Sequence, residues 1–177
     1  QEFKGSLTAF EAATAITQGA RRILTDAKIV ELPLADGGPH TAEIVAAATG
    51  GELITAKITG PLGDPINARF ALIPGAGSAP PTALIEAAHA AGLLLIPPER
   101  RDPGIATSYG VGELIQHALD RKVGTLIVGV GGTATNDGGA GAAQAIGYRL
   151  LDRERKSLPT PVGGIHLLNL FALDSSE

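Results

Sequence analysis

The sequence predicts an α/β fold with a parallel sheet and a second subdomain of mixed strands. Residues 27–34, rich in Ile, Val and Leu, have the pattern of a strand that passes through a glycine turn into a helix at 41–49. This strand–loop–helix order is typical of parallel sheets. Residues 125–130 repeat the pattern, because a short apolar run leads into a glycine-rich loop that opens a helix. Between them, residues 52–59 and 66–73 alternate in polarity, which indicates half-buried strands.

The first helix is expected over residues 8–25, where apolar side chains recur at helical spacing. Thr8 is expected to be its N-cap, and Glu11, three residues later, completes the pattern of a capping box. The helix at 41–49 is expected to end at Gly50, because glycine readily adopts the left-handed conformation that closes a helix.

Further elements follow the mixed strands. A third strand is expected at 82–85, a helix at 110–121, and another helix at 142–151 after the glycine-rich loop. Changes in the hydrophobic pattern divide the chain into a first α/β part, a mixed-strand subdomain, an α/β part with the glycine-rich loop, and a turn-rich tail. Their expected bounds are 1–51, 52–100, 101–158 and 159–177.

Composition excludes several classes of protein. The chain has 177 residues, of which 44% are hydrophobic, so it is long and apolar enough to bury a core. It has no cysteine, which excludes disulfides and thiolate metal sites and suits a cytoplasmic protein. A net charge of -4, without a basic stripe, argues against a nucleic-acid partner. No apolar run reaches the ~18 residues of a membrane helix, so no membrane partner is expected.

The strongest chemical signal is the segment 125–141, in which a buried strand runs into a glycine-rich loop that opens a helix. Glycine loops and helix N-termini present backbone N–H groups to phosphate. Thr133 and Thr135 can donate hydroxyl groups to phosphate oxygens, and Asp137 can hold a metal ion or orient an attacking hydroxyl. The alternative is a tight strand–helix turn in which Asp137 caps the helix.

A second signal is the turn Asp36-Gly37-Gly38 at the end of the strand predicted at 27–34. Open α/β sheets bind ligands at the carboxyl ends of their parallel strands. A carboxylate followed by two permissive glycines suits a metal ion or a substrate with hydroxyl groups. An ordinary turn, in which Asp36 accepts a hydrogen bond from its own backbone, explains the residues equally well.

Weaker signals have simpler explanations. Lys4 and Ser6 suit a phosphate but also a solvated helix start, and Thr107 and Ser108 precede a helix, where they suit an anion or a cap. Glu86 ends an apolar run and is either a buried carboxylate with a partner or a charge at a strand edge.

The four histidines show no HxxxH or HxH spacing, so no zinc site is expected. His89 and His117 lie in helical stretches, where histidine is more often a surface or packing residue than a ligand.

Six motifs in a fixed order carry a resemblance to a known family. The sequence resembles the bacterial-type glycerate kinase family from Phe3 to about Leu158, and matches its N-terminal portion. The motifs are FKGSL at 3–7, ADGG at 35–38, TGPLGDPINARF at 59–70, RDP at 101–103, TSYGVGELI at 107–115 and GVGGTATNDGGAG at 129–141.

The resemblance implies two α/β domains, one of them flavodoxin-like, with a Rossmann-like parallel sheet, and the other inserted into it. It implies a cytoplasmic kinase that uses ATP and magnesium to phosphorylate its small-molecule substrate D-glycerate, with 2-phosphoglycerate as the expected product. Two alternatives stay open: a non-catalytic α/β fragment that binds an anion, and a kinase of a related sugar acid.

Site residues are carried over from the motifs they belong to. Lys4, Asp36 and Asp137 are the expected catalytic residues, with Asp36 or Asp137 as the Mg²⁺ ligand. The residues expected to bind substrate or phosphate are Ser6, Gly37, Gly38, Thr107, Ser108, Gly131, Gly132, Thr133, Thr135, Asn136, Gly138, Gly139 and Gly141.

The sequence departs from the family pattern in three places. Gln1 and Glu2 stand where the family has Asp-Ser at the end of a first strand, and Pro39 and His40 stand where it has Glu-Gly. Proline fixes φ and removes a donor N–H, which changes that loop. Family members also continue well past residue 177, so we expect a longer protein.

Overall fold

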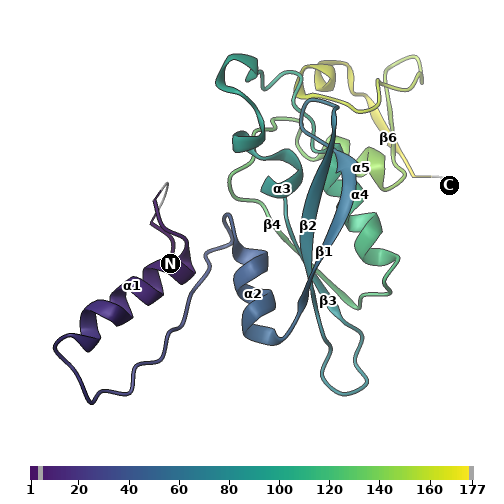
Figure 1. The fold of residues 1–177 in the computed structure, drawn as a ribbon. Helices are drawn as coiled ribbons and strands as arrows, with labels where there is room; N and C mark the ends of the chain where they lie inside the picture. Colours follow the sequence, from purple (N-terminus) through teal and green to yellow (C-terminus); the bar gives the residue numbers. More distant parts are fainter. Residues whose placement is uncertain (4–5, 176–177) are drawn as a thin grey trace.

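The computed structural model describes residues 1–3 and 6–175, and its body is built on a four-stranded mixed sheet (Figure 1). The order along the sheet is β1-β2-β3-β4. The first three strands pair antiparallel, and β3 pairs parallel with β4. The strands are β1 (Glu52–Thr59), β2 (Pro65–Ile73), β3 (Thr82–Glu86) and β4 (Thr125–Gly129).

Helices cover both faces of this sheet. One face packs on α2 (Thr41–Thr49), through a cluster that includes Ala42 and Ala71. The other face packs on α4 (Tyr109–Leu119) and the short α3 (Ala88–Ala91), through a larger cluster around Phe70. Phe70 and Ala71 are neighbours in β2 and lie on opposite faces, as strand geometry requires, so both clusters follow from the alternation read in the sequence. The mixed α/β fold class is therefore confirmed.

Glycines let α4 approach its neighbours closely. A Cβ atom at Gly110 would lie 2.0 Å from the Thr59 carbonyl oxygen of β1, and one at Gly112 would lie 2.3 Å from the Ala142 carbonyl oxygen of α5 (Ala140–Ala145). No side chain fits at either distance, so glycine at these positions sets how closely the helices pack.

The C-terminal part forms a separate two-stranded sheet of β5 (Arg149–Leu151) and β6 (Ala172–Asp174), with a 3-10 helix, η3 (Gly164–Asn169), between them. The helix predicted at 142–151 is therefore wrong in its second half. Gly147 has a φ of 108°, which ends the helix, and Leu150 is buried beside Leu158 and Val162. Packing of Leu150 outweighs the helical pattern of the segment.

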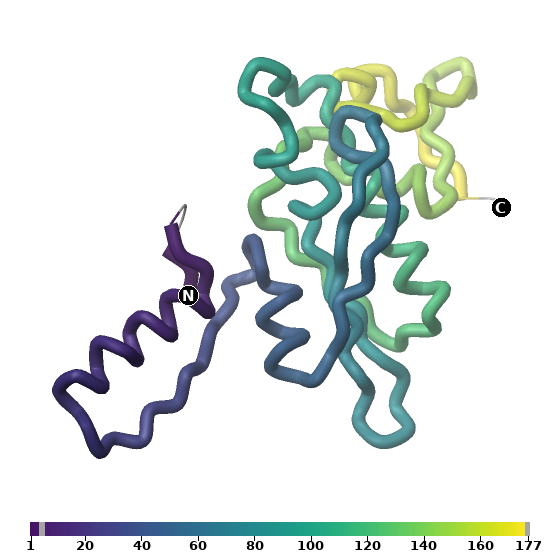
Figure 2. The backbone as a smooth tube through the Cα atoms, in the orientation of Figure 1, coloured from purple at the N-terminus to yellow at the C-terminus, as the bar shows by residue number. Residues whose placement is uncertain are grey.

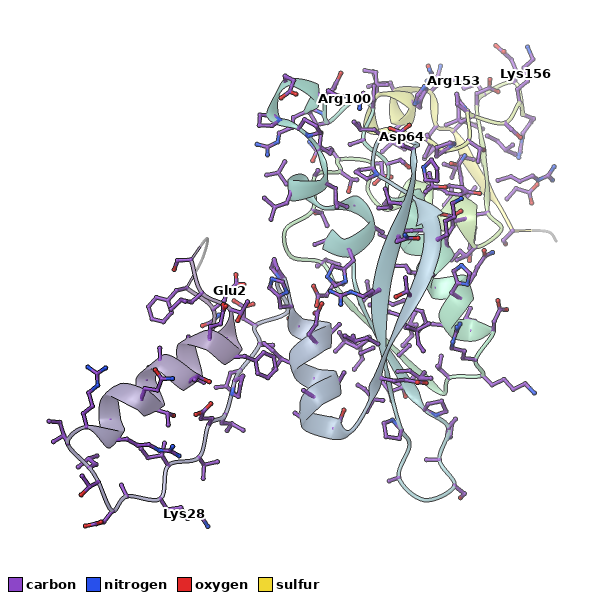
Figure 3. All side chains as sticks on the ribbon, viewed as in Figure 1. Glu2, Lys28, Asp64, Arg100, Arg153 and Lys156 are labelled. Carbon is purple, nitrogen blue, oxygen red and sulfur yellow. The ribbon has the colours of Figure 1, made fainter. Side chains whose placement is uncertain are left out.

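Two 3-10 turns, η1 (Leu93–Leu95) and η2 (Pro98–Arg100), lie between α3 and α4. Arg100 and Asp64 meet at one end of the molecule, where Figure 3 labels both, with 3.9 Å between the guanidinium nitrogen and the carboxylate oxygen. Both side chains are mostly exposed, so this ion pair contributes little to stability.

The N-terminal helix α1 (Ala9–Arg21) has the predicted N-cap. The Thr8 hydroxyl accepts the backbone N–H of Glu11, and the Glu11 carboxylate accepts the backbone N–H of Thr8, as a capping box requires. The helix ends earlier than the 8–25 expected, at Arg21.

The strand predicted at 27–34 is wrong: the structure shows extended chain without sheet pairing there. Figures 1 and 2 show α1 and this segment running beside the body rather than within its sheet, with Lys28 labelled at its far end in Figure 3. Apolar side chains alone do not make a strand, because its N–H and C=O groups need a neighbouring edge. No described strand provides one, and Val30, Leu32 and Leu34 are exposed.

The sheet joins strands from both sides of the boundary predicted between residues 100 and 101, since β3 pairs with β4 across it. Among the described residues, none of the helices has the length and apolar character to cross a membrane.

Replacing Gly112 with alanine should destabilise the fold by roughly 1–3 kcal/mol, because the new methyl group collides with the Ala142 carbonyl and separates α4 from α5. Urea unfolding followed by circular dichroism measures the change. Gly19→Ala is the matched control: Gly19 lies within α1 with nothing within 4 Å of its Cβ position, so this variant should be unchanged or up to ~1 kcal/mol more stable. Equal stability of the two variants would contradict the packing argument.

Candidate functional site

Loops from distant parts of the sequence meet at the carboxyl ends of the parallel strands β3 and β4. Glu86 and Gly129, the last residues of these strands, are partners in the parallel register. The turn Asp36-Gly37-Gly38 lies against the same edge: a Cβ atom at Gly129 would lie 2.9 Å from the Gly37 carbonyl oxygen. This is the edge at which open α/β sheets bind ligands. Lys4, the third predicted catalytic residue, lies outside the described residues.

A cavity of about 240 Å³ opens at this edge. Two segments that the sequence predicted for the site meet at its polar wall, because Ser108 lies there beside residues of the glycine-rich loop at 131–141. That wall comprises Ser108, Thr133, Thr135, Asp137, Gly138 and Gly139. The remainder is apolar and is formed by Ala87, Ala91, Val111, Val128, Val130 and Ala142. The cavity therefore has an apolar lining with hydroxyl groups on one wall.

Asp137 is buried beneath the loop, with 1% of its surface exposed. Its Oδ2 atom accepts hydrogen bonds from the backbone N–H of Ser108 at 2.8 Å, from the Ser108 hydroxyl at 2.7 Å and from the backbone N–H of Gly141 at 3.1 Å. Its Oδ1 atom accepts the backbone N–H of Gly139 at 3.1 Å. The Ser108 hydroxyl in turn accepts the backbone N–H of Ala142 at 3.0 Å. One carboxylate therefore joins the starts of α4 and α5.

These bonds leave little of the α5 N-terminus for a ligand. The N–H groups of Gly141 and Ala142, which a helix start would otherwise offer to an anion, are taken by Asp137 and Ser108. Of the two interpretations that the sequence left open, this geometry is that of a strand–helix turn capped by an aspartate. Both Asp137 oxygens accept hydrogen bonds in a buried position, so this carboxylate holds the turn in place.

Gly141 and Thr107 have a packing role in the same place. A Cβ atom at Gly141 would lie 2.4 Å from the Thr107 hydroxyl oxygen and 2.7 Å from the Tyr109 nitrogen. Thr107 is buried, and its hydroxyl accepts the backbone N–H of Tyr109 at 3.2 Å. Both residues thus shape the contact between α4 and the loop.

Most of the exposed positions of the loop lie in its first half, from Gly131 to Asn136. Thr135 is half-buried at the cavity wall, and Thr133 is exposed there. Neighbouring positions that sequence analysis also placed in the site are exposed as well: Gly131, Gly132, Asn136 and Gly138.

Asp36 is exposed on the neighbouring turn. Its Oδ1 atom accepts the backbone N–H of Gly38 at 2.9 Å, and its Oδ2 atom accepts the Gln1 side-chain amide at 2.5 Å. Ser6 is exposed, and its hydroxyl donates to the Phe3 carbonyl at 3.1 Å; it does not line the cavity. The structure thus brings the loop at 131–141 together with Gly37 and Ser108, and it keeps Ser6 out of that cavity.

Sequence reasoning placed Glu86 in no site, although the structure puts it at this edge. The Glu86 carboxylate is buried, and its Oε1 atom accepts the backbone N–H of Ala42 at 2.5 Å, which fixes the start of α2. Burial raises the pKa of Glu86, and the Ala42 N–H and the nearby His89 oppose that rise. Its position at the end of the apolar run TALIE is the signal that could have identified it, because a strand buried on both faces carries its last side chain inside.

Comparisons with known proteins agree with this architecture. A family model described as "Glycerate kinase family" matches residues 1–177. The chain is 50% identical over 175 residues to a glycerate kinase of Haemophilus influenzae and 47% identical over 167 residues to a glycerate 2-kinase of Escherichia coli. These matches cover 99% and 94% of this chain but 45% and 43% of the two relatives, so the chain spans less than half of their length.

A solved crystal structure assigned to glycerate kinase 2 of Salmonella typhimurium LT2 has the same fold over this region. It matches with a TM-score of 0.82 at 49% identity, and the match covers 99% of this chain and 46% of that one.

Asp137→Ala should lower the free energy of unfolding by about 3 kcal/mol, because it leaves the buried N–H groups of Ser108 and Gly141, and the part-buried N–H of Gly139, without an acceptor. Denaturant unfolding measures this loss. Asp102→Ala is the control, since Asp102 accepts the N–H of Gly104 in an exposed turn and its loss should cost about 1 kcal/mol or less. If Asp137 were instead a reacting group with no positioning role, its variant would lose turnover and keep its stability.

Proposed function

We propose, from the premise that this chain belongs to the glycerate kinase family, that it provides part of the active site of an enzyme that phosphorylates D-glycerate. The observation that carries the proposal is the identity of 50% to a glycerate kinase across 99% of the chain. The cavity at the carboxyl ends of β3 and β4 is where we place the reaction.

The proposed reaction transfers the γ-phosphoryl group of ATP to a hydroxyl of D-glycerate. A new O–P bond forms to the hydroxyl oxygen, the bond between the γ-phosphorus and the β–γ bridging oxygen breaks, ADP leaves, and the hydroxyl proton is released. This chemistry asks the protein for positioning and charge neutralisation rather than for covalent participation. Hydroxyl groups and exposed loop backbone serve both needs.

The cavity suits a small substrate. Its volume of about 240 Å³ lies below the ~300 Å³ at which sites for drug-sized ligands begin. The hydroxyl groups of Thr133 and Thr135 lie on its wall and can donate hydrogen bonds to a carboxylate or a phosphate. We therefore assign these two threonines to substrate or phosphate binding, with the exposed backbone of Gly131 and Gly132 beside them.

Magnesium, which a kinase uses with ATP, needs oxygen ligands and keeps several waters. Asp36 fits this need, because its carboxylate is exposed on the turn that docks at Gly129. Asp137 fits less well, since it is buried and its Oδ2 atom alone accepts three hydrogen bonds, whereas each oxygen of the exposed Asp36 accepts one. When bound, the ion neutralises charge on the phosphates; Asp36 would hold it, while Asp137 would keep the loop in place.

We propose 2-phosphoglycerate as the product, supported by the 47% identity to the glycerate 2-kinase of Escherichia coli. We also propose action in the cytoplasm, where ATP is available. The alternatives from the sequence are tested by the same assay: absence of turnover by this chain in isolation supports an anion-binding fragment, and faster turnover of another sugar acid supports the related kinase.

Incubation of the whole protein with D-glycerate, ATP and Mg²⁺ should yield ADP and a single phosphoglycerate. A coupled assay measures ADP release, and phosphorus NMR identifies the phosphorylated hydroxyl. Phosphorus on the third carbon would contradict the proposed product, and no ADP release in a protein that is folded by circular dichroism would contradict the kinase.

Thr133→Val and Thr135→Val remove the hydroxyl groups and preserve shape, so each should lower kcat/KM for D-glycerate by about 10- to 100-fold, the effect of losing one or two hydrogen bonds to a charged ligand. Thr125→Val is the matched control, because Thr125 is exposed at the opposite end of β4. Unchanged kcat/KM in both loop variants would remove the loop from the binding site.

A further inference from the structure

Three side chains from three elements converge near the carboxyl ends of β3 and β4. Glu43 lies in the first turn of α2, Glu86 ends β3, and His89 lies in α3. One carboxylate oxygen of each glutamate and one ring nitrogen of the histidine lie within 4.8 Å of one another. None of the three belongs to the cavity wall described above.

The cluster contains polar atoms that the protein leaves without a hydrogen bond. The Glu86 side chain is 2% exposed, and its Oε2 atom is buried without a hydrogen-bond partner. The Oε2 atom of Glu43 is also buried without one, although its Oε1 atom pairs with Arg69 at 2.6 Å. A buried carboxylate oxygen without a partner costs free energy, and a cation bound in this cluster would remove that cost for both glutamates.

His89 is oriented as a ligand. Its Nδ1 atom lies 3.0 Å from the backbone carbonyl oxygen of Arg69. A carbonyl can only accept, so Nδ1 carries a proton, and in the neutral imidazole Nε2 then has the lone pair that a metal ion needs. Nε2 faces the Glu86 Oε2 atom at 3.5 Å. A histidine whose other ring N–H donates to a backbone carbonyl is the usual arrangement at metal centres, because the bond fixes the tautomer and the ring.

A protonated His89 alone does not account for the cluster. Its Nε2–H would reach the Glu86 Oε2 atom only at 3.5 Å, and it would leave the Glu43 Oε2 atom without a hydrogen bond. The other cation in contact, Arg69, is already paired with the Glu43 Oε1 atom. One ion placed between the three ligand atoms would satisfy both glutamates and the imidazole together.

We propose that Glu43, Glu86 and His89 form a binding site for a divalent transition metal of the Zn²⁺ type. Two carboxylates and an imidazole are ligands that Zn²⁺ accepts, with an open position left for water. Imidazole disfavours Mg²⁺, which prefers an all-oxygen shell, so this site is distinct from the one assigned to Asp36. Ligands about 2.1 Å from a tetrahedral ion lie about 3.4 Å apart, so the side chains need to close by little more than ~1 Å.

The metal ion would link α2, β3 and α3 near the carboxyl ends of β3 and β4. Glu86 already fixes the start of α2 through Ala42, and α2 follows directly on the turn that carries Asp36. The ion would therefore hold this turn against β3 and β4. Sequence analysis expected no zinc site, because the histidines show no HxxxH or HxH spacing. Such spacings detect only ligands that are close in sequence, whereas Glu43, Glu86 and His89 come from three elements.

Titration of the metal-free protein with Zn²⁺ tests the proposal. Calorimetry should show one Zn²⁺ per chain. Co²⁺ should give the visible absorption of a four- or five-coordinate ion. Residues 1–177 contain no cysteine, so a thiolate from this part of the protein cannot be the source of that absorption. His89→Gln should weaken Zn²⁺ binding by at least ~10- to 100-fold. His117→Gln, in the last turn of α4 and outside the cluster, is the matched control and should bind as the parent does.

Two outcomes would overturn the site: no saturable Zn²⁺ binding by the folded parent, or equal binding by the parent and His89→Gln. If His89→Gln does not fold, Glu43→Gln decides in its place, because Glu43 is only partly buried. The titration uses neither ATP nor glycerate, so failure of the proposed kinase activity would leave its result unchanged.

Discussion

The arrangement of the loops at the carboxyl ends of β3 and β4 depends on one buried carboxylate, that of Asp137. It accepts the backbone N–H of Ser108, which lies 29 residues away at the start of α4, and the backbone N–H of Gly141 at the start of α5. A buried charge of this kind is stable only when its oxygens are satisfied, so the loop between β4 and α5 has to bring Gly139 and Gly141 back to it. This requirement explains why the loop is rich in glycine: its turns need positive φ at Gly138 and Gly139, and Gly141 leaves no room for a side chain.

Glu86 has the corresponding role at the neighbouring strand. It ends β3 as Asp137 follows β4, and it fixes the start of α2 through a bond that spans 44 residues. In both cases an acidic side chain at the carboxyl edge of the sheet occupies the N-terminus of a helix. A carboxylate of the protein therefore occupies the α5 N-terminus, where sequence analysis expected a phosphate, and this is why the proposed binding groups are those of Thr133 and Thr135. The proposed metal at Glu86 extends the same principle, since it would satisfy a carboxylate oxygen that α2 does not reach.

Local features were predictable from the sequence and long-range ones were not. The capping box of Thr8 and Glu11, the helix over Thr41–Thr49 and the strand that enters the glycine-rich loop all depend on neighbours in sequence, and the structure confirms them. The strand at 27–34 failed because pairing depends on an edge that local sequence does not contain. The bonds from Ser108 to Asp137 and the cluster of Glu43, Glu86 and His89 join different elements, so no spacing rule could find them.

Asp137 holds the loop in place, and amide hydrogen exchange tests this role most directly. In Asp137→Asn, the Ser108 and Gly141 amides should exchange at least ~10-fold faster than in the parent, because each loses its charged acceptor. The Phe70 amide, in the centre of the sheet, should be unaffected. Unchanged exchange at Ser108 and Gly141 would show that the carboxylate does not organise the loop, and would contradict the account.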